Sequence, residues 1–517
     1  MSRVRNTLVP CLVFLLLPCA GAGSDLATRI EAVISRAEYR PAHWGILIVD
    51  AESGETVYAH DPDKLFFPAS TTKLYSCAAA LDALGADYRF ETPVYRRGTV
   101  KDGRLQGDLI LVAQGDLTLG GRTDANGRMA FKDYDHIYAN GNSRAELTDT
   151  DPLAGLKSLA QQVAATGIHH VQGDVLIDDR LFTHSRGSGS GPGLLTPIVV
   201  NDNVVDIVVT PADKPGKPAS VRIRPETAFV QMDAQVDTVG EAERLRVDVR
   251  SAGPHGFAVR GRIPIKAKPL VRIYAVDDPA QFARALFIEA LRGQGVGVSA
   301  SPLQAPAAQL PEKENYTNLS RVAVFASPPF SEIIKVTLKV SHNLYASTLP
   351  LLIAAKNGQK TVADGLHQQR RFLADLGIDA ESISFGGGAG GANADAVTPR
   401  ATVHLLRALA KRADYKLFHA GLPILGVDGT LADAVGPDSP ARGKVHAKTG
   451  TLTWDDLMNG RSLLTSKALA GTMTTANGRP LIVALYVNGV PLPKGVTSTR
   501  EGKALGELCE IIYQHAP

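Results

Sequence analysis

Ser70 and Lys73 could supply a nucleophile and its base. Residues three apart share a helix face, so a helix that begins near Ser70 would put the Lys73 amine beside the Ser70 hydroxyl. The helix start would also direct free backbone N–H groups toward the atom that the serine attacks. The pKa of lysine is normally about 10.4, so Lys73 can accept a proton near neutral pH only if burial and a second nearby cation lower its pKa. By itself Ser-x-x-Lys is a weak signal, and a capping serine with a surface lysine is the simpler interpretation.

A second pattern, Ser341-His342-Asn343, falls between two predicted helices. Serine and asparagine commonly cap helices, so capping is the ordinary interpretation. In a catalytic site, Asn343 would hydrogen-bond a substrate amide and Ser341 would relay a proton to the leaving amine.

A third pattern, Lys448-Thr449-Gly450-Thr451, begins a predicted strand. An edge strand with a solvated lysine is the alternative. In a catalytic site, Lys448 would be the second cation, and Gly450 would permit close approach of the substrate backbone. The hydroxyls of Thr449 and Thr451 would hold a carboxylate.

The elements that position these patterns lie at the two ends of the chain. The spacing of Leu74, Cys77, Ala78 and Leu81 predicts a buried helix after Ser70, preceded by strands at 45–49 and 55–58. Near the other end we predict helices at 331–339 and 343–355, strands at 448–453 and 480–488, and a helix after residue 499. Neither end alone supplies a complete layered core, so we expect them to pack together.

The middle of the chain, from about 92 to 315, has short alternating strands and helices near 152–163 and 281–292. It predicts one or two inserted β-rich modules. The Ser/Gly-rich run 185–193 is either a seam between them or a surface loop.

Composition narrows the function class. The chain has 517 residues, of which 44% are hydrophobic and 21% charged, with a formal net charge of +3. A chain of this length predicts about three domains. The small net charge and the absence of a long basic run argue against a nucleic-acid partner.

Residues 1–23 resemble an export leader. Arg3 and Arg5 precede an apolar run over 8–17, and Ala20-Gly21-Ala22 fits a cleavage site, so we expect cleavage near Ala22. A membrane anchor is the alternative, but the run is short and contains prolines, so no stable membrane span is predicted. Lipidation at Cys19 is a further alternative.

No cofactor or metal is predicted. Cys77 and Cys509 would remain after leader removal, and we expect both to be reduced core residues. His342 and His446 adjoin the patterns above, but no convergent ligand spacing accompanies them, so we interpret them as neighbours rather than ligands.

The three patterns, in this order, are the set found in penicillin-binding proteins and class A β-lactamases. Over nearly all of the mature chain, the sequence resembles the D-alanyl-D-alanine carboxypeptidase/endopeptidase family of low-molecular-mass class C penicillin-binding proteins. The resemblance also rests on five further segments, at 115–119, 171–175, 178–182, 201–205 and 426–431.

This resemblance implies a multi-domain α/β fold. A discontinuous transpeptidase/β-lactamase-like domain, with an antiparallel sheet flanked by helices, would carry nested β-rich inserted domains. The expected parts are the transpeptidase-like domain at 24–91 and 316–517, an inserted domain at 92–185 and 266–315, and a nested domain at 186–265.

The resemblance also implies residue roles. The catalytic residues would be Ser70 as nucleophile, Lys73 as base, and Ser341, Asn343 and Lys448. Thr449, Gly450, Thr451 and Asp178 would bind substrate, with Asp178 facing the amine of a diamino acid. A turn aspartate is the alternative for Asp178. The oxyanion hole would use the backbone N–H groups of Ser70 and Thr451.

One departure from the family concerns the loop before Val397-Thr398-Pro399. The family often has Asp-Gly-Ser-Gly-Leu-Ser there, whereas this chain has residues 387–392, GGAGGA. A hydroxyl contribution from this loop is therefore absent.

The implied function is a periplasmic serine DD-peptidase. It would cleave D-alanyl-D-alanine bonds of peptidoglycan peptides as a carboxypeptidase, and β-lactams would acylate it. The sequence does not separate this activity from endopeptidase action on cross-links, because both cut the same type of bond. A β-lactamase-type hydrolase and a non-catalytic cell-wall binding protein on the same fold are the alternatives. The long insert between Ser70 and Ser341 argues against the β-lactamase.

Overall fold

The computed structural model describes residues 23–517. The predicted leader, except for Gly23, lies outside the described residues. Within the described part, no helix has the length and apolar character needed to cross a membrane.

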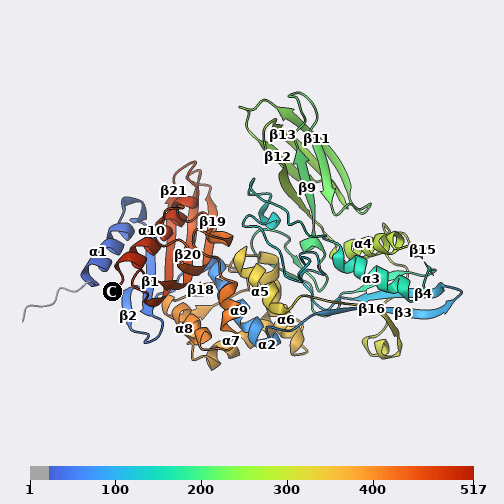
Figure 1. The fold of residues 1–517 in the computed structure, drawn as a ribbon, viewed down its shortest axis with the longest axis horizontal. Coiled ribbons are helices and arrows are strands. Elements are labelled where there is room, and N and C mark those ends of the chain that lie inside the picture. Colours follow the sequence, from blue (N-terminus) through green and yellow to red (C-terminus); the bar gives the residue numbers. More distant parts are fainter. Residues whose placement is uncertain (1–22) are drawn as a thin grey trace, which may run out of the picture.

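One five-stranded antiparallel sheet joins the two ends of the chain (Figure 1). Its order is β19-β20-β21-β1-β2. The strands are β1 (His43–Asp50), β2 (Thr56–His60), β19 (Val445–Asp456), β20 (Arg461–Thr474) and β21 (Pro480–Leu492). Because β1 pairs with β21, about 430 residues apart along the chain, the sheet joins the two ends of the chain. The third pattern lies on β19 of this sheet, and the first pattern lies in the helical layer beside it.

Helices cover both faces of this sheet. Side chains alternate along a strand, so Ile46 and Ile48 pack on one face while Leu47 and Val49 pack on the other. The first face contacts α1 (Gly23–Ile34) and α10 (Thr499–His515). On the second face, α8 (Pro399–Ala410) packs directly against the sheet. The other helices on this side share one hydrophobic core with it: α2 (Thr72–Leu84), α5 (Phe330–Lys339), α6 (Asn343–Lys356), α7 (Val362–Asp375) and α9 (Tyr415–Ala420).

The middle of the chain forms a second sheet region, to the right in Figure 1. Its order is β15-β5-β4-β3-β16, with β6 also pairing with β4. The strands are β3 (Glu91–Lys101), β4 (Arg104–Val112), β5 (His170–Val171), β6 (Val175–Asp178), β15 (Gly297–Val298) and β16 (Ser320–Ala326). Helices α3 (Ala154–Ala165) and α4 (Pro279–Gly293) pack against it.

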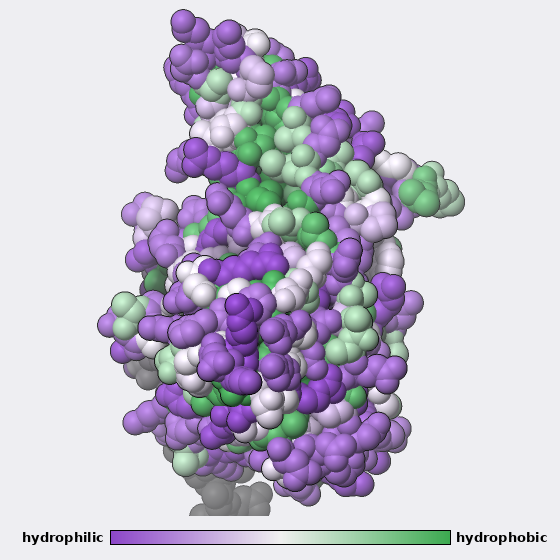
Figure 2. All heavy atoms as spheres, turned by 90° about the vertical axis from the view of Figure 1, so that its right-hand side faces the viewer, coloured by the Kyte–Doolittle hydropathy of each residue, from purple (hydrophilic) through white to green (hydrophobic). Residues whose placement is uncertain are grey.

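Two three-stranded sheets extend from this region, at the top of Figure 1. One contains β9 (Val204–Thr210), β10 (Ser220–Arg224) and β14 (Leu270–Ala275), and the other contains β11 (Gln231–Val239), β12 (Arg246–Ser251) and β13 (Gly256–Pro264). Figure 2 shows that the tip of this extension is mainly hydrophilic. The remaining strands form two short two-stranded sheets: β7 (Ser185–Arg186) pairs with β8 (Leu194–Leu195), and β17 (Ile383–Ser384) pairs with β18 (Ala396–Val397).

The predicted fold class is confirmed. One boundary differs, because β16 lies after residue 315 and pairs with β3 of the inserted region. Pairing between strands more than 200 residues apart leaves no local signal in the sequence. The other domain boundaries stay predictions.

Candidate active site

Ser70 lies in a short 3-10 helix, η2 (Ala69–Thr71), which leads directly into α2. Lys73 is one turn further on, and its Nζ lies 2.8 Å from the Ser70 Oγ. The preceding residue, Ala69, has a φ of 45°, a left-handed conformation that is costly for a residue with a Cβ. The surrounding packing must therefore hold Ala69 in this conformation, and the turn that it forms presents Ser70.

Lys73 is fully buried and makes three hydrogen bonds. Besides Ser70 Oγ, its Nζ donates to Asn343 Oδ1 at 2.8 Å and to the Ala389 carbonyl at 2.9 Å. When the amine is neutral, it can keep the last two bonds and turn its lone pair toward the Ser70 hydroxyl. The pair thus has the geometry of a nucleophile and its base.

Burial lowers the pKa of Lys73 to about 7. The sequence led us to expect that a second cation would be needed, but desolvation is the main cause of this shift. The second cation is affected in turn: burial, and then the charge of Lys73, hold the pKa of Lys448 well below its usual range. Near neutral pH, Lys73 is therefore poised to take or give a proton.

The second pattern meets the third beside Ser70. Lys448 Nζ lies 2.9 Å from Ser341 Oγ and 2.7 Å from the Thr449 carbonyl. Ser341 has a φ of 62°, and the Tyr138 hydroxyl donates to its carbonyl. The inserted region thus helps to hold Ser341 in this left-handed conformation.

The Ser/Gly-rich run 185–193 forms one wall of the same site. Ser190 accepts a 3.3 Å hydrogen bond from Asn343 Nδ2 through its carbonyl. A Cβ on Gly189, which has a φ of 92°, would lie 2.4 Å from that nitrogen. This segment therefore packs against the catalytic cleft, and glycine is required for the close approach.

Gly450 lies where the edge strand β19 approaches the Ser70 turn. A Cβ there would be 2.6 Å from the Pro68 carbonyl oxygen and 3.1 Å from the Ala69 Cβ. Glycine is thus needed for contact with the protein's own backbone, whereas the sequence led us to expect contact with substrate. Thr449 Oγ1 donates to Thr430 Oγ1 at 2.7 Å, and Thr451 Oγ1 accepts from Lys467 Nζ at 2.8 Å.

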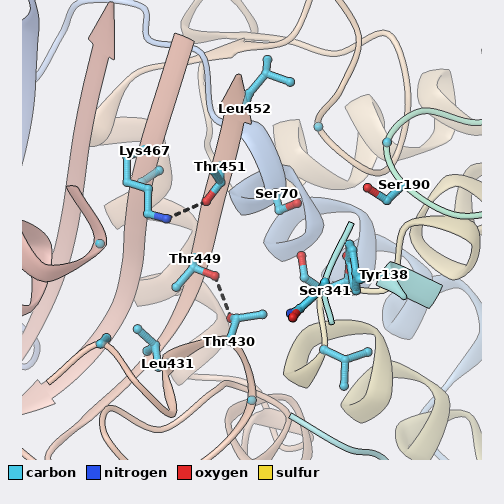
Figure 3. A pocket seen from close by; sticks show the side chains of 18 of the residues that line it. Ser70, Tyr138, Ser190, Ser341, Thr430, Leu431, Thr449, Thr451, Leu452 and Lys467 are labelled. Atoms are coloured by element: carbon cyan, nitrogen blue, oxygen red, sulfur yellow. Dashed lines mark hydrogen bonds between the residues drawn. The ribbon is translucent and has the colours of Figure 1, made fainter. Parts of the chain in front are cut away.

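These groups line a pocket of about 590 Å³ (Figure 3). Its labelled polar lining is Ser70, Tyr138, Ser190, Ser341, Thr430, Thr449, Thr451 and Lys467. Three of them, Tyr138, Ser190 and Lys467, belong to no motif in the sequence, although the Ser/Gly-rich composition around Ser190 gave a signal. Thr430 belongs to segment 426–431, which supports the family resemblance but was given no role.

A family model for the D-Ala-D-Ala carboxypeptidase 3 (S13) family matches residues 26–506. The chain belongs to this family.

Two similar proteins are named D-alanyl-D-alanine carboxypeptidases. The D-alanyl-D-alanine carboxypeptidase of Actinomadura sp. (strain R39) is 29% identical over 466 residues, which cover 84% of this chain and 78% of the relative. The D-alanyl-D-alanine carboxypeptidase DacB of Haemophilus influenzae is 26% identical over 459 residues, covering 86% and 85%. The crystal structure of penicillin binding protein 4 (dacB) from H. influenzae shares the fold, with a TM-score of 0.69, 21% identity and coverage of 95% and 99%.

Membership of the S13 family confirms the predicted family and the predicted serine DD-peptidase class of hydrolase. The roles assigned to single residues stay predictions. The geometry brings Ser70, Lys73, Ser341, Asn343, Lys448, Thr449, Gly450 and Thr451 together.

Asp178 does not join this S13 site. It ends β6, and it is absent from the lining of the pocket. Its carboxylate accepts from Arg180 Nε at 2.9 Å, from a second Arg180 nitrogen at 2.7 Å and from the Tyr316 hydroxyl at 2.7 Å. The carboxylates that do line the pocket are Asp133 and Asp433.

The loop that departs from the S13 pattern contributes backbone instead of hydroxyls. The Ala389 carbonyl accepts from Lys73, and the Gly388 carbonyl accepts from Ser76 at 2.8 Å. Asp395 closes this loop by accepting from the backbone N–H groups of Gly386 and Ala392. A Cβ on Gly390 would lie 1.7 Å from the Ala69 carbonyl oxygen, so glycine lets the loop lie against the Ser70 turn.

A buried network of charged and polar groups lies behind the second pattern. Asp202 accepts from Arg122 at 2.6 Å, from His136 at 2.7 Å and from His342 Nε2 at 3.3 Å, and it also accepts from the Tyr345 hydroxyl. His342 Nδ1 in turn accepts from the Tyr345 N–H and caps α6. The inserted region thereby anchors the helix that begins at Asn343.

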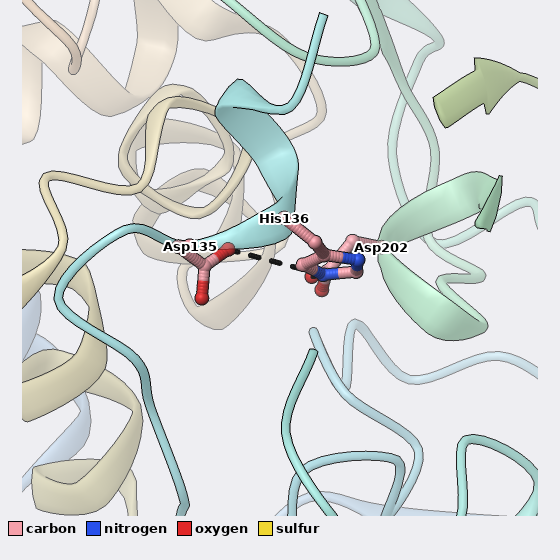
Figure 4. A group of neighbouring side chains, drawn as sticks. All are labelled: Asp135, His136 and Asp202. Atoms are coloured by element: carbon pink, nitrogen blue, oxygen red, sulfur yellow. Dashed lines mark hydrogen bonds and ion pairs between the residues drawn. The ribbon is translucent and has the colours of Figure 1, made fainter. Parts of the chain in front are cut away.

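Three members of this network, Asp135, His136 and Asp202, have ligand atoms close enough for a metal ion (Figure 4). His136 Nδ1 contacts Asp206 at 2.5 Å, and Nε2 contacts Asp202. Burial disfavours the charged ring, but Asp206 and Asp202 outweigh it and raise the pKa of His136 to about 10. Both ring nitrogens therefore carry protons, and Arg122 is already ion-paired with Asp135 and Asp202, so these groups form an ion network rather than a ligand set.

Replacing Asp202 with alanine should destabilise the protein. It leaves the buried Arg122 and His136 charges without this partner, which costs about 3–5 kcal/mol. Urea denaturation followed by circular dichroism measures the free energy of unfolding. Asp149, whose side chain is 98% exposed, is the control, and D149A should change stability by less than about 0.5 kcal/mol. Equal stability of the two variants would contradict this account of the network.

Proposed function

We propose that this chain removes the terminal D-alanine from peptidoglycan peptides through an acyl-enzyme on Ser70. One observation carries the proposal: the Lys73 amine is 2.8 Å from Ser70 Oγ while Lys448 is 2.9 Å from Ser341 Oγ, and both serines face one pocket. A hydroxyl with a buried base, opposite a second hydroxyl with its own cation, suits acyl transfer from an amide.

Lys73 begins the reaction as the neutral amine. It takes the Ser70 proton as Oγ bonds to the D-alanine carbonyl carbon, and the carbonyl oxygen becomes an oxyanion. Backbone N–H groups of Ser70 and Thr451 would stabilise that charge, each donor contributing about a hundredfold to a thousandfold in rate.

Breakdown of this intermediate expels the leaving amine. Ser341 gives that amine a proton and recovers one from Lys448, which is within hydrogen-bond reach of it. The terminal D-alanine departs, leaving the rest of the peptide as an ester on Ser70. Water then attacks the ester and gives up a proton, which restores Lys448 through Ser341, while the protonated Lys73 returns its proton to Ser70 Oγ as the ester bond breaks.

The same site would react with β-lactams, which combine a strained amide with a carboxylate. The Haemophilus relative has been crystallised with a β-lactam, and its fold is shared here. An export leader at residues 1–23 would deliver the enzyme to the periplasm, where peptidoglycan peptides are found.

Diacetyl-lysyl-D-alanyl-D-alanine tests the proposal. We expect mass spectrometry to detect free D-alanine and the shortened peptide, and muropeptides to lose one alanine mass or a cross-link. A folded protein that releases no D-alanine from either substrate would contradict the proposal and would favour the non-catalytic alternative. Rapid turnover of nitrocefin without peptide cleavage would favour the β-lactamase alternative.

A further inference from the structure

Lys467 lies on the pocket wall beside the third pattern. It is on β20, directly opposite Thr451 of β19 in the strand pairing. Its Nζ donates to Thr451 Oγ1 at 2.8 Å. Figure 3 shows Lys467 reaching toward Thr451, with Ser70 beyond Thr451 in this view. The Lys467 ammonium thus lines the same pocket as Ser70.

This ammonium has no carboxylate partner within ion-pair distance among residues 23–517. Glu501 of α10 is the acidic group whose charge acts on it, and Glu501 is paired with Arg500 at 2.5 Å. Burial lowers the pKa of Lys467 to about 8, so the side chain is mainly charged at pH 7. A partly desolvated cation in a pocket is stabilised when an anion enters.

The hydrogen bonds of the two threonines differ. Thr449 donates its proton to Thr430, whereas Thr451 accepts from Lys467 and keeps its own proton free. The free O–H of Thr451 and the adjacent ammonium can therefore donate to one ligand together. Lys503, from the start of α10, lines the same pocket and adds positive charge.

We propose that Lys467 is a further substrate-binding residue, which acts with the Thr451 hydroxyl to bind the carboxylate next to the scissile amide. The proposal rests on the proposed function, because it is the D-alanine carboxylate that would dock there. Thr449 and Thr451 of the third pattern can offer hydroxyl groups to this carboxylate. Lys467 adds a positive charge, which attracts the negative carboxylate.

The test compares a peptide with a free carboxylate and the same peptide with a C-terminal carboxamide. For diacetyl-lysyl-D-alanyl-D-alanine, K467M should lower kcat/KM about tenfold to a hundredfold, as expected for loss of a hydrogen bond to a charged group. For the carboxamide, K467M should stay within about twofold of the wild type. K467R should keep most of the activity on the free acid. K494M, which removes an exposed lysine outside the pocket, is the matched control.

Acylation provides the second readout. Benzylpenicillin and its methyl ester differ in the same carboxylate, and K467M should slow acylation by the free acid selectively. An equal loss on charged and uncharged compounds would indicate a structural role and overturn the proposal, and so would no loss on either. If the wild-type enzyme releases no D-alanine and is not acylated, the proposed function fails; if the wild type is active and K467M matches it, only the role of Lys467 fails.

Discussion

Replacing Ser70 with alanine is expected to lower the rate of D-alanine release by roughly a millionfold. The substitution removes the atom that carries the acyl group in the proposed reaction, while Lys73 keeps its bonds to Asn343 and Ala389. The loss should therefore appear in kcat, with the melting temperature unchanged within a few degrees. Continuous detection of D-alanine and a thermal melt measure both quantities.

Ser35 provides the control for this substitution. It is an exposed serine whose hydroxyl bonds only the Glu31 carbonyl at the end of α1. S35A should keep wild-type kcat. Peptidase activity surviving in S70A at more than a small fraction of the wild-type value would mean that another residue carries the acyl group.

The acylation rate should rise about tenfold per pH unit below pH 7 and level off between pH 7 and pH 8. Burial lowers the pKa of Lys73 to about 7, and only the neutral amine can accept the Ser70 proton. As pH falls through 7, the amine is protonated and the base is lost. Stopped-flow measurement with a chromogenic β-lactam between pH 5 and 8 records this limb.

The variant K73R tests the assignment of that limb. Arginine keeps its charge throughout this range, so acylation should fall by about a hundredfold to ten-thousandfold and lose its pH dependence. K64R, at an exposed lysine paired with Asp61, should reproduce the wild-type profile. A K73R enzyme that retains the rising limb would show that a different group titrates there.

Local patterns predicted the catalytic elements well. The apolar spacing after Ser70 corresponds to α2, and the helix expected at 343–355 corresponds to α6 (Asn343–Lys356). The strand expected at 448–453 is longer, from Val445 to Asp456, because it pairs with β20 along its whole length. The prediction omitted β20 itself, in which small and polar residues weaken the alternation of a strand.

The residues that the sequence could not reveal come mostly from the inserted region. Tyr138, Ser190 and Asp202 are 140 to 203 residues from the motif residues that they contact, and only the fold brings them to Ser341, Asn343 and His342. Segment 201–205 and the Ser/Gly-rich run 185–193 stood out in the sequence, but each contact is a single long-range hydrogen bond that no local pattern could assign. The inserted region therefore does more than extend the molecule, since it holds the second pattern in its strained conformation.

Intact-protein mass spectrometry after incubation with benzylpenicillin, followed by peptide mapping, most directly tests whether the three patterns form one acylation site at Ser70. The geometry around Lys73 and Lys448 predicts one covalent adduct per chain, located on the peptide that contains Ser70, and no adduct in S70A. An adduct on any other residue, or none on a folded wild-type protein, would contradict the account.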